Sequence, residues 1–157
     1  MTALPELVRA TPDEWQRWRE VRLRALAADP DAFGSRLEVE RDWTEEQWRQ
    51  RLADGRDLFA VVDGAAVATA GWFVREPGWG DVVAMWVAPE WRSRGLGRLV
   101  LSAVVEEVRA AGLRVRLWVA DGNPARRLYE HAGFVPTGEQ APIRPGATAT
   151  KSLLVLE

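Results

Sequence analysis

Apolar residues recur at two different spacings along the chain, and the changes between these spacings predict its elements. Residues 7–10 alternate as a short strand, and the apolar residues that follow keep helical spacing up to Asp29-Pro30. Thr11 and Glu14 have the spacing of a capping box at the start of this helix. The next stretch, 29–41, is polar and broken by Pro and Gly, which predicts a loop.

A second helix is predicted from Thr44, where Gln47 completes a capping box, to about Gly55. Beyond it, short runs with period-two patterns are separated by Asp-Gly and Pro-Gly turns, as in antiparallel hairpins. The predicted strands are 58–62, 65–74 and 81–87.

From Gly95 the apolar period becomes helical again, and this helix closes at Gly112. The remaining predicted elements are a strand over 115–119, a short helix started by Asn123-Pro124 and ended by Gly133, and strands from 134 and 152. The order holds three antiparallel strands followed by one strand–helix–strand crossover. It predicts a single α/β domain over 1–157, with a mixed central β-sheet that is mostly antiparallel, one parallel crossover, and helices on both faces.

Composition narrows the chemistry. The chain of 157 residues has no cysteine and a single histidine, which excludes disulfides, thiolate metal sites and multi-histidine zinc sites. The chain has a net charge of −2 and no long block of like-charged residues, so we expect neither nucleic acid nor a membrane surface as partner. No apolar run approaches the ~20 residues of a membrane span and the N-terminus lacks a signal pattern, which predicts a cytoplasmic location.

The segment 87–98 carries the strongest chemical signal. A strand ends there, Gly95 and Gly97 follow, and a long helix begins. The first turn of a helix leaves amide groups unpaired at the positive end of the helix dipole, and glycine lets an anion approach the backbone. Formal positive charge around the turn comes from Arg92, Arg94 and Arg98. The segment predicts a phosphate or pyrophosphate site; alternatively, the glycines serve only a tight turn.

Two other phosphate-binding motifs were weighed against this segment. A P-loop needs Lys followed by Ser or Thr after the glycines, and Arg98-Leu99 does not supply it. A dinucleotide-binding fold is a closer alternative, with Asp121 at a suitable distance to hold a ribose. However, Val100 replaces the third glycine, and the segment follows an antiparallel hairpin. Asp121-Gly122 is better explained as a turn.

These residues resemble a known family. Arg92-x-x-Gly95-x-Gly97 is similar to the acetyl-CoA pyrophosphate signature of the GNAT superfamily, the Gcn5-related N-acetyltransferases. The segment 123–134, NPARRLYEHAGF, resembles that superfamily's second signature, and 29–35 is similar to a loop of many bacterial members. Together with the element order, the resemblance covers nearly the whole chain.

The resemblance implies acetyl-CoA as cosubstrate, no metal, and transfer of the acetyl group to a primary amine of a small molecule or peptide by direct attack. In such enzymes the strand before the signature is splayed from its neighbour, and a backbone N–H of this strand would bind the thioester oxygen. Asn123 would hold the cofactor arm, cap its helix, or do both. The implied cofactor-binding residues are Met85, Trp86, Val87, Arg92, Ser93, Arg94, Gly95, Leu96, Gly97, Arg98, Asn123 and Arg126.

Tyr129 matches the tyrosine that serves as general acid in many family members, where its hydroxyl would protonate the departing thiolate. It also lies on the apolar stripe of its helix, so packing is the alternative. His131 points to a different helix face and is given no catalytic role.

The sequence indicates the general base less clearly than it indicates the general acid. The glutamate that some members carry in the strand before the signature is absent here, and Asp81 is our first choice because it opens that strand. The alternatives are Glu38, Glu40 and Glu76, and each of these carboxylates would ordinarily be a solvated surface charge. The missing glutamate keeps open a second function, a non-catalytic acyl-CoA-binding module of the same fold.

The acceptor amine is expected between the first two helices, their connecting loop and the late hairpin. Candidate walls are the aromatic residues Phe33, Trp43, Trp72 and Trp79, which would equally suit a core. Aromatic walls with scattered carboxylates favour an amine that carries an apolar group. The resemblance also makes a homodimer reasonable.

Overall fold

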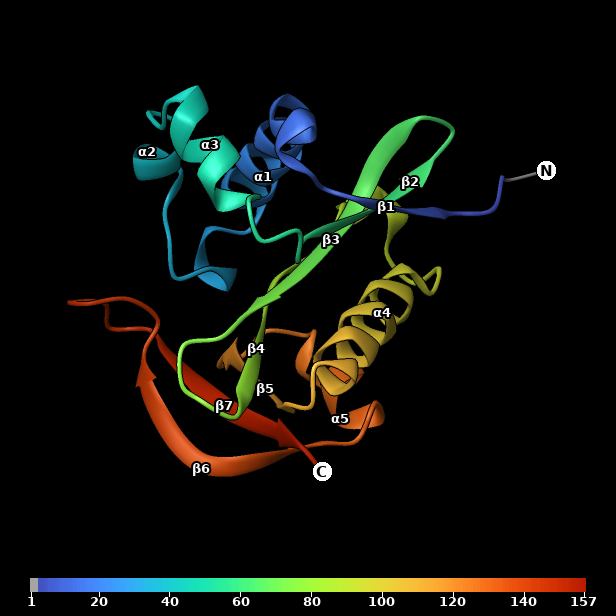
Figure 1. Cartoon of the computed structure of the whole chain (residues 1–157). Helices are drawn as coiled ribbons and strands as arrows, with labels where there is room; N and C mark the ends of the chain where they lie inside the picture. The colour runs from blue at the N-terminus through green and yellow to red at the C-terminus, as the bar shows by residue number, and fades with distance from the viewer. Residues whose placement is uncertain (1–2) are drawn as a thin grey trace.

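A computed structural model describes residues 3–157 and contains one seven-stranded sheet, in the order β1-β2-β3-β4-β5-β7-β6 (Figure 1). The strands are β1 (Glu6–Arg9), β2 (Leu58–Val62), β3 (Ala65–Phe73), β4 (Trp79–Val87), β5 (Arg114–Ala120), β6 (Phe134–Pro142) and β7 (Thr150–Leu156). The helices are α1 (Trp15–Ala28), α2 (Leu37–Glu40), α3 (Glu45–Arg51), α4 (Leu96–Ala110) and α5 (Arg126–His131). Short 3-10 turns are η1 (Pro12–Glu14), η2 (Pro30–Ala32) and η3 (Pro89–Trp91).

The predicted fold class is confirmed. Of the neighbouring strand pairs, β4 and β5 run parallel and the others run antiparallel. The sheet is therefore not the parallel sheet of a doubly wound dinucleotide-binding fold. Among residues 3–157, no helix combines the length and the apolar character needed to cross a membrane.

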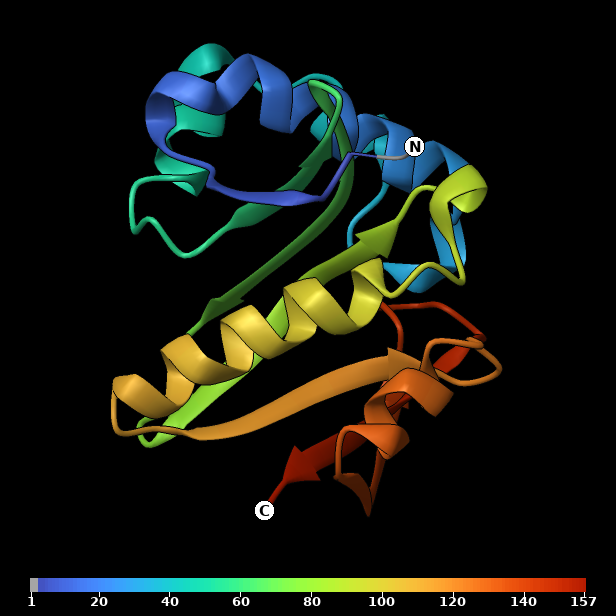
Figure 2. The ribbon, with the colours of Figure 1, turned by 90° about the vertical axis from the view of Figure 1, so that its right-hand side faces the viewer.

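Helices cover both faces of the sheet and divide its buried side chains into two cores. On one face α4 and α5 pack over the central strands, and on the other α1 and α3 do so. Figure 2 shows α4 lying along the sheet, with α1 to α3 gathered at the opposite side. The close approach of α4 requires Gly80, because a Cβ there would lie 2.5 Å from a methyl group of Val108.

The N-terminal region differs from the sequence prediction in two places. Thr11 makes no side-chain cap, and the chain enters α1 through η1. The segment predicted as a loop contains η2 and α2. Helix α2 is held by a tertiary contact, because Arg22 of α1 donates two hydrogen bonds to the buried Glu40 carboxylate, each 3.0 Å long. The capping box of α3 at Thr44 and Gln47 is confirmed.

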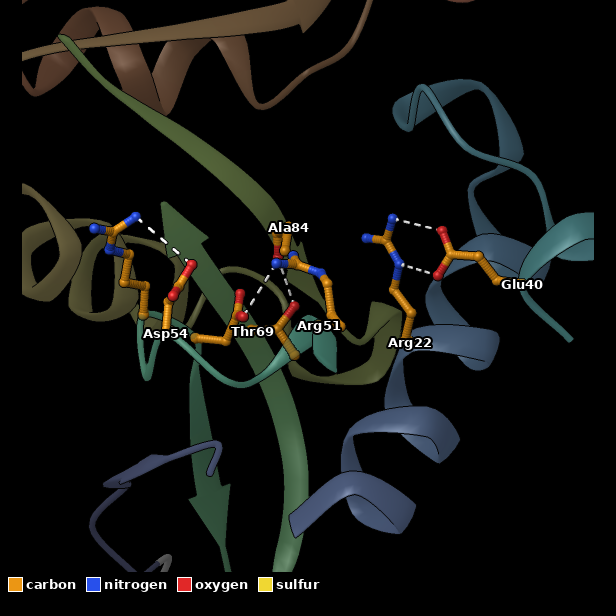
Figure 3. A network of polar contacts seen from close by, with 8 residues as sticks. Arg22, Glu40, Arg51, Asp54, Thr69 and Ala84 are labelled. Carbon is orange, nitrogen blue, oxygen red and sulfur yellow. Dashed lines mark hydrogen bonds and ion pairs between the residues drawn. The ribbon is translucent and has the colours of Figure 1, made fainter. Parts of the chain in front are cut away.

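Strand β4 carries a bulge at Ala84 that changes the course of the strand. The register between β3 and β4 shifts between Thr69 and Gly71, and Ala84 has a φ of +57°. The Thr69 hydroxyl donates a 2.6 Å hydrogen bond to the Ala84 carbonyl and so holds the bulge (Figure 3). Bulges bend a strand and end regular pairing, and they are frequent beside functional sites.

Beyond the bulge, β4 and β5 separate. Their ladder covers four residue pairs and ends at Val82 opposite Leu117. Figure 2 shows β4, in yellow-green, diverging from β5, in orange, toward the start of α4. Residues 83–87 of β4 therefore have no backbone partners in β5.

Candidate functional site

The opening between β4 and β5 connects two cavities. The large cavity has a volume of about 1050 Å³ and lies between the start of α4 and the start of α5. The small cavity, of about 280 Å³, lies toward α1, η2 and β7. Both are lined by Asp31, Ala32, Met85, Ala120, Asn123 and Tyr129. A molecule in one cavity can therefore meet a molecule in the other at the point where the strands part.

The first turn of α4 faces the large cavity with its amide groups uncapped. Gly95 begins the helix with a φ of +83° and no side-chain cap, and Ser93 before it has a φ of +64°. The first hydrogen bond of the helix runs from the Leu99 amide to the Gly95 carbonyl. The amides before Leu99 therefore have no helical partner. Left-handed residues in such a turn direct successive N–H groups into one concavity, which binds anions.

Gly97 brings the two signature segments together. A Cβ at this position would lie 3.0 Å from the Leu128 side chain of α5 and 3.7 Å from that of Val87 in β4. The absence of a side chain lets the start of α4 pack closely against α5. As a result, both segments border the same cavity.

The arginines of the turn have different surroundings. Arg92 lines the large cavity, but its guanidinium donates to the Val87 carbonyl at 3.0 Å and to the Asp29 carboxylate at 2.8 Å. The Trp86 indole donates to the same Asp29 oxygen at 2.8 Å. Asp29 thus ties the end of α1 to the end of β4.

Of the other predicted cations, Arg98 lines the large cavity and two do not. Arg94 stacks over Trp91, with 4.8 Å from its guanidinium carbon to the ring centroid. Arg126 lies 3.9 Å from Glu130 on its own helix. Neither side chain lines the cavity, and the cofactor-binding role of Arg94 and Arg126 stays a prediction. The other predicted cofactor-binding residues line it: Met85, Trp86, Val87, Arg92, Ser93, Gly95, Leu96, Gly97, Arg98 and Asn123.

Asn123 caps the turn that leads into α5. Asn123 lies three residues after the end of β5, and its Oδ1 accepts a 2.9 Å hydrogen bond from the Ala125 amide. Helix α5 itself begins at Arg126, later than the Asn-Pro pair predicts. Asn123 lines both cavities.

Tyr129 lies at the junction and is only 5% exposed. Its ring packs edge-on against Phe134 at 6.1 Å, so the packing role is real. Burial raises the pKa of the phenol above its usual value of 10.0, which keeps the hydroxyl protonated as a hydrogen-bond donor.

Asp81 lines the small cavity and is 2% exposed. The Arg116 Nε donates to its Oδ1 at 2.6 Å, and the same guanidinium donates to Glu76 at 2.9 Å. Its other oxygen, Oδ2, is buried without a partner in the described part of the chain. A buried carboxylate oxygen with no donor is costly, so Oδ2 is the free acceptor of this residue.

The three alternative general bases, Glu38, Glu40 and Glu76, lie outside the small cavity. Glu40 is buried and occupied by Arg22, and Glu38 is exposed on α2. Glu76 pairs with Arg116 at the surface. None of these three lines the small cavity.

The predicted aromatic walls lie in different parts of the molecule. Phe33 lines the small cavity, whereas Trp43 packs on Trp48 at 4.8 Å between ring centroids. Trp72 lies on the opposite face of the sheet, where its indole donates to Glu107 at 3.2 Å. Trp79 is covered by Arg114, at 4.1 Å. The aromatic walls that sequence reasoning missed are Phe73 and Trp118.

Sequence reasoning also missed the cations of the small cavity. They are Arg22 of α1, Arg51 of α3, Arg75 after β3, and Lys151 of β7. No local motif marks these residues, because they come from four distant segments. In residues 3–157 no group of three or more His, Cys, Asp or Glu side chains is placed to hold a metal ion.

Solved structures define the class of fold. An acetyltransferase of the GNAT family from Streptococcus pneumoniae superposes with a TM-score of 0.79 at 21% identity, covering 97% of this chain and 98% of that one. The Salmonella typhimurium acetyltransferase yncA, solved with its cofactor acetyl-CoA, gives a TM-score of 0.78 at 19% identity, covering 99% and 94%. At these identities the likeness concerns the fold.

Sequence comparison defines the family. The model of the Acetyltransferase (GNAT) family matches residues 14–134, and the chain belongs to this family. A mycothiol acetyltransferase from Beutenbergia cavernae is 34% identical over 136 residues, which cover 83% of this chain and 44% of that protein. The chain thus spans less than half the length of this curated relative.

Proposed function

We propose that residues 1–157 form one domain that transfers an acetyl group from acetyl-CoA to a primary amine by direct attack. The observation that carries this proposal is the junction of the two cavities at the parted strands, beside Tyr129. A large cavity under a helix start suits a nucleotide cofactor, and a small one suits an acceptor. Membership of the GNAT acetyltransferase family supports the same activity.

Acetyl-CoA would bind in the large cavity. Its pyrophosphate would lie on the uncapped amides at the start of α4, where the helix dipole favours negative charge. Its pantetheine arm would run along residues 83–87, whose backbone groups have no partners in β5. A backbone N–H of Met85, Trp86 or Val87 would stabilise the charge that develops on the thioester oxygen during attack.

Tyr129 would assist the leaving group. The unperturbed pKa of a thiol is about 8.5, which is lower than that of the buried phenol. Full proton transfer from Tyr129 to the thiolate is therefore uphill. We infer that the phenol acts mainly by donating a hydrogen bond to sulfur as the C–S bond breaks, with the proton finally supplied from solvent.

Asp81 would receive the acceptor. An alkylammonium ion has a pKa of about 10 and must lose a proton before it attacks. The unpartnered Oδ2 of Asp81 would bind this group and take the proton, directly or through water. The nitrogen forms its bond to the acetyl carbon as the bond to sulfur breaks, one proton leaves the amine, and one ends on CoA.

A thiol-release assay across a panel of amines tests the proposal. Release of free CoA that requires both acetyl-CoA and an amine is the expected result. Stabilisation by CoA in a thermal melt without thiol release from any amine would favour the acyl-CoA-binding module instead. The cytoplasmic location and the homodimer stay predictions, to be tested by cell fractionation and by light scattering.

A further inference from the structure

Four cationic side chains line the small cavity, which is more positive charge than the binding of an apolar amine requires. Two of its cations are already neutralised. Arg22 reaches Glu40 with two nitrogens, and Arg51 donates to the buried Asp57 at 3.2 Å. Figure 3 shows both side chains in this network, with Arg51 on the side of Arg22 that faces away from Glu40. These pairs fix the wall near α1.

The other two cations, Arg75 and Lys151, have no ion-pair partner among residues 3–157. Each is held over an aromatic ring that also lines the cavity. Arg75 lies 5.1 Å from the centre of Phe73, and Lys151 lies 4.9 Å from that of Trp118. Cations held on aromatic faces are positioned in advance, so little side-chain entropy is lost when they bind an anion.

Arg75, which is exposed, and Lys151, which is half-buried, line the same cavity, and their like charges oppose each other. Desolvation by burial, and next the charge of Arg75, lower the pKa of Lys151 below its usual value. Two unpaired cations beside one cavity are an unfavourable arrangement. An anion bound between them would relieve the repulsion and form charge-assisted hydrogen bonds with both.

The same cavity contains the opposite charge. Asp81 lies near enough to raise the pKa of Lys151 in part, and its buried Oδ2 has no donor within the described chain. The cavity therefore offers two free cations and the carboxylate of Asp81, with Asp31 at the junction with the large cavity. This pattern is complementary to a molecule that carries both an ammonium and an anionic group.

We propose that the acceptor is a small amine that carries its own carboxylate or phosphate, bound by Arg75 and Lys151, while its amine group meets Asp81. This inference rests on the proposed acetyl transfer and names its substrate class. The volume of about 280 Å³ is near the lower end of the ~300–1,000 Å³ typical of ligand pockets, which favours a small molecule. Phe33, Phe73 and Trp118 would pack against its apolar part. A free amino acid with an apolar side chain meets these requirements.

Matched acceptors test the charge requirement in the unaltered protein. Phenylalanine, its amide, phenethylamine and the aminophosphonate analogue of phenylalanine share a ring and an amine but differ in the anionic group. We expect kcat/KM in the thiol-release assay to be about 10-fold to 100-fold higher for the carboxylate or the phosphonate than for the amide. The better of the two identifies the natural anionic group.

Variants then locate the contact. Arg75→Gln and Lys151→Gln should each lower kcat/KM for the acidic acceptor by about 10-fold and leave that for the amide within about 2-fold. Arg109→Gln, which removes an exposed arginine at the far end of α4, should behave like the unaltered protein. Thermal melts confirm that each variant folds, and the acceptor comparison needs no variant.

Several outcomes overturn the proposal. It is wrong if the amide and phenethylamine are acetylated as well as the acids, or if both variants weaken acidic and neutral acceptors equally. A peptide amine that outperforms every acidic acceptor also rejects it. In these cases acetyl transfer itself stands. If no amine releases thiol, the proposed function fails and this inference fails with it.

Discussion

The two cavities are built from different parts of the chain. The large cavity is bordered by uncapped backbone amides of one contiguous turn, from Arg92 to Arg98, where we propose that the anion binds. The small cavity takes its charges from side chains on α1, α3, the end of β3 and β7. Backbone groups are the same in every sequence, whereas side chains are free to change. The difference teaches that cofactor binding can be common to a family while the acceptor differs between its members.

The largest expected effect lies at the junction of the cavities. Tyr129→Phe removes the hydroxyl but keeps the ring that packs on Phe134. Because the hydroxyl would act only as sulfur gains charge, we expect kcat to fall about 100-fold or more. The affinity for CoA, measured by calorimetry, should change less than about 3-fold. Equal losses in kcat and CoA affinity would instead make Tyr129 a packing residue.

The second effect tests the buried ion pair behind the small cavity, in which Asp57 accepts a hydrogen bond from Arg51 of the cavity wall. Burial raises the pKa of Asp57 from 3.8 to about 6, against the opposing charge of Arg51. Between these values the folded state holds a proton that the unfolded state has lost, so stability falls as pH rises through about 4 to 6. A rise of about 2 in pKa corresponds to about 3 kcal/mol lost by pH 7.

Asp57→Asn should remove this part of the pH dependence, because the amide does not titrate. Urea unfolding at pH 4 and pH 7 measures the difference, which should be about 3 kcal/mol larger in the unaltered protein than in the variant. Asp54→Asn is the matched control, since Asp54 is exposed and lies 3.9 Å from Arg56. The same pH dependence in all three proteins would contradict the assignment to Asp57.

The third effect tests whether the large cavity depends on backbone geometry. Gly95 has a φ of +83° with open space around it, so Gly95→Ala adds strain without a clash. We expect a loss of about 1 kcal/mol in stability and a rise of about 10-fold in the KM for acetyl-CoA, with the acceptor KM unchanged. Gly64→Ala is the control, because this hairpin glycine has a φ of +81° and also has open space. It should lose similar stability and keep its kinetics.

The smallest effect separates two arginines of the same turn. Arg98 lines the large cavity and Arg94 stacks on Trp91 outside it. Arg98→Ala should raise the KM for acetyl-CoA about 5-fold, whereas Arg94→Ala should change it less than about 2-fold. Steady-state kinetics with varied acetyl-CoA decide between them. The reverse order would show that the turn binds the cofactor in a different arrangement.

The features that could be predicted from the sequence depend on interactions between residues close together in the chain. The turn at Gly95, the capping box of Thr44 and Gln47, and the order of strands and helices all follow from hydrogen bonds and steric limits within a few residues. The resemblance to GNAT signatures added the expected cofactor and Tyr129, because those motifs are also contiguous.

Only the tertiary structure decided where β4 and β5 part, since that depends on a bulge at Ala84 held by Thr69 from another strand. It also placed Trp43 and Trp72 away from the small cavity and brought Arg75 and Lys151 beside it. The physical reason is that a helix turn is specified by neighbours in the chain. The lining of a cavity is instead specified by which side chains converge after the sheet and its helices have packed.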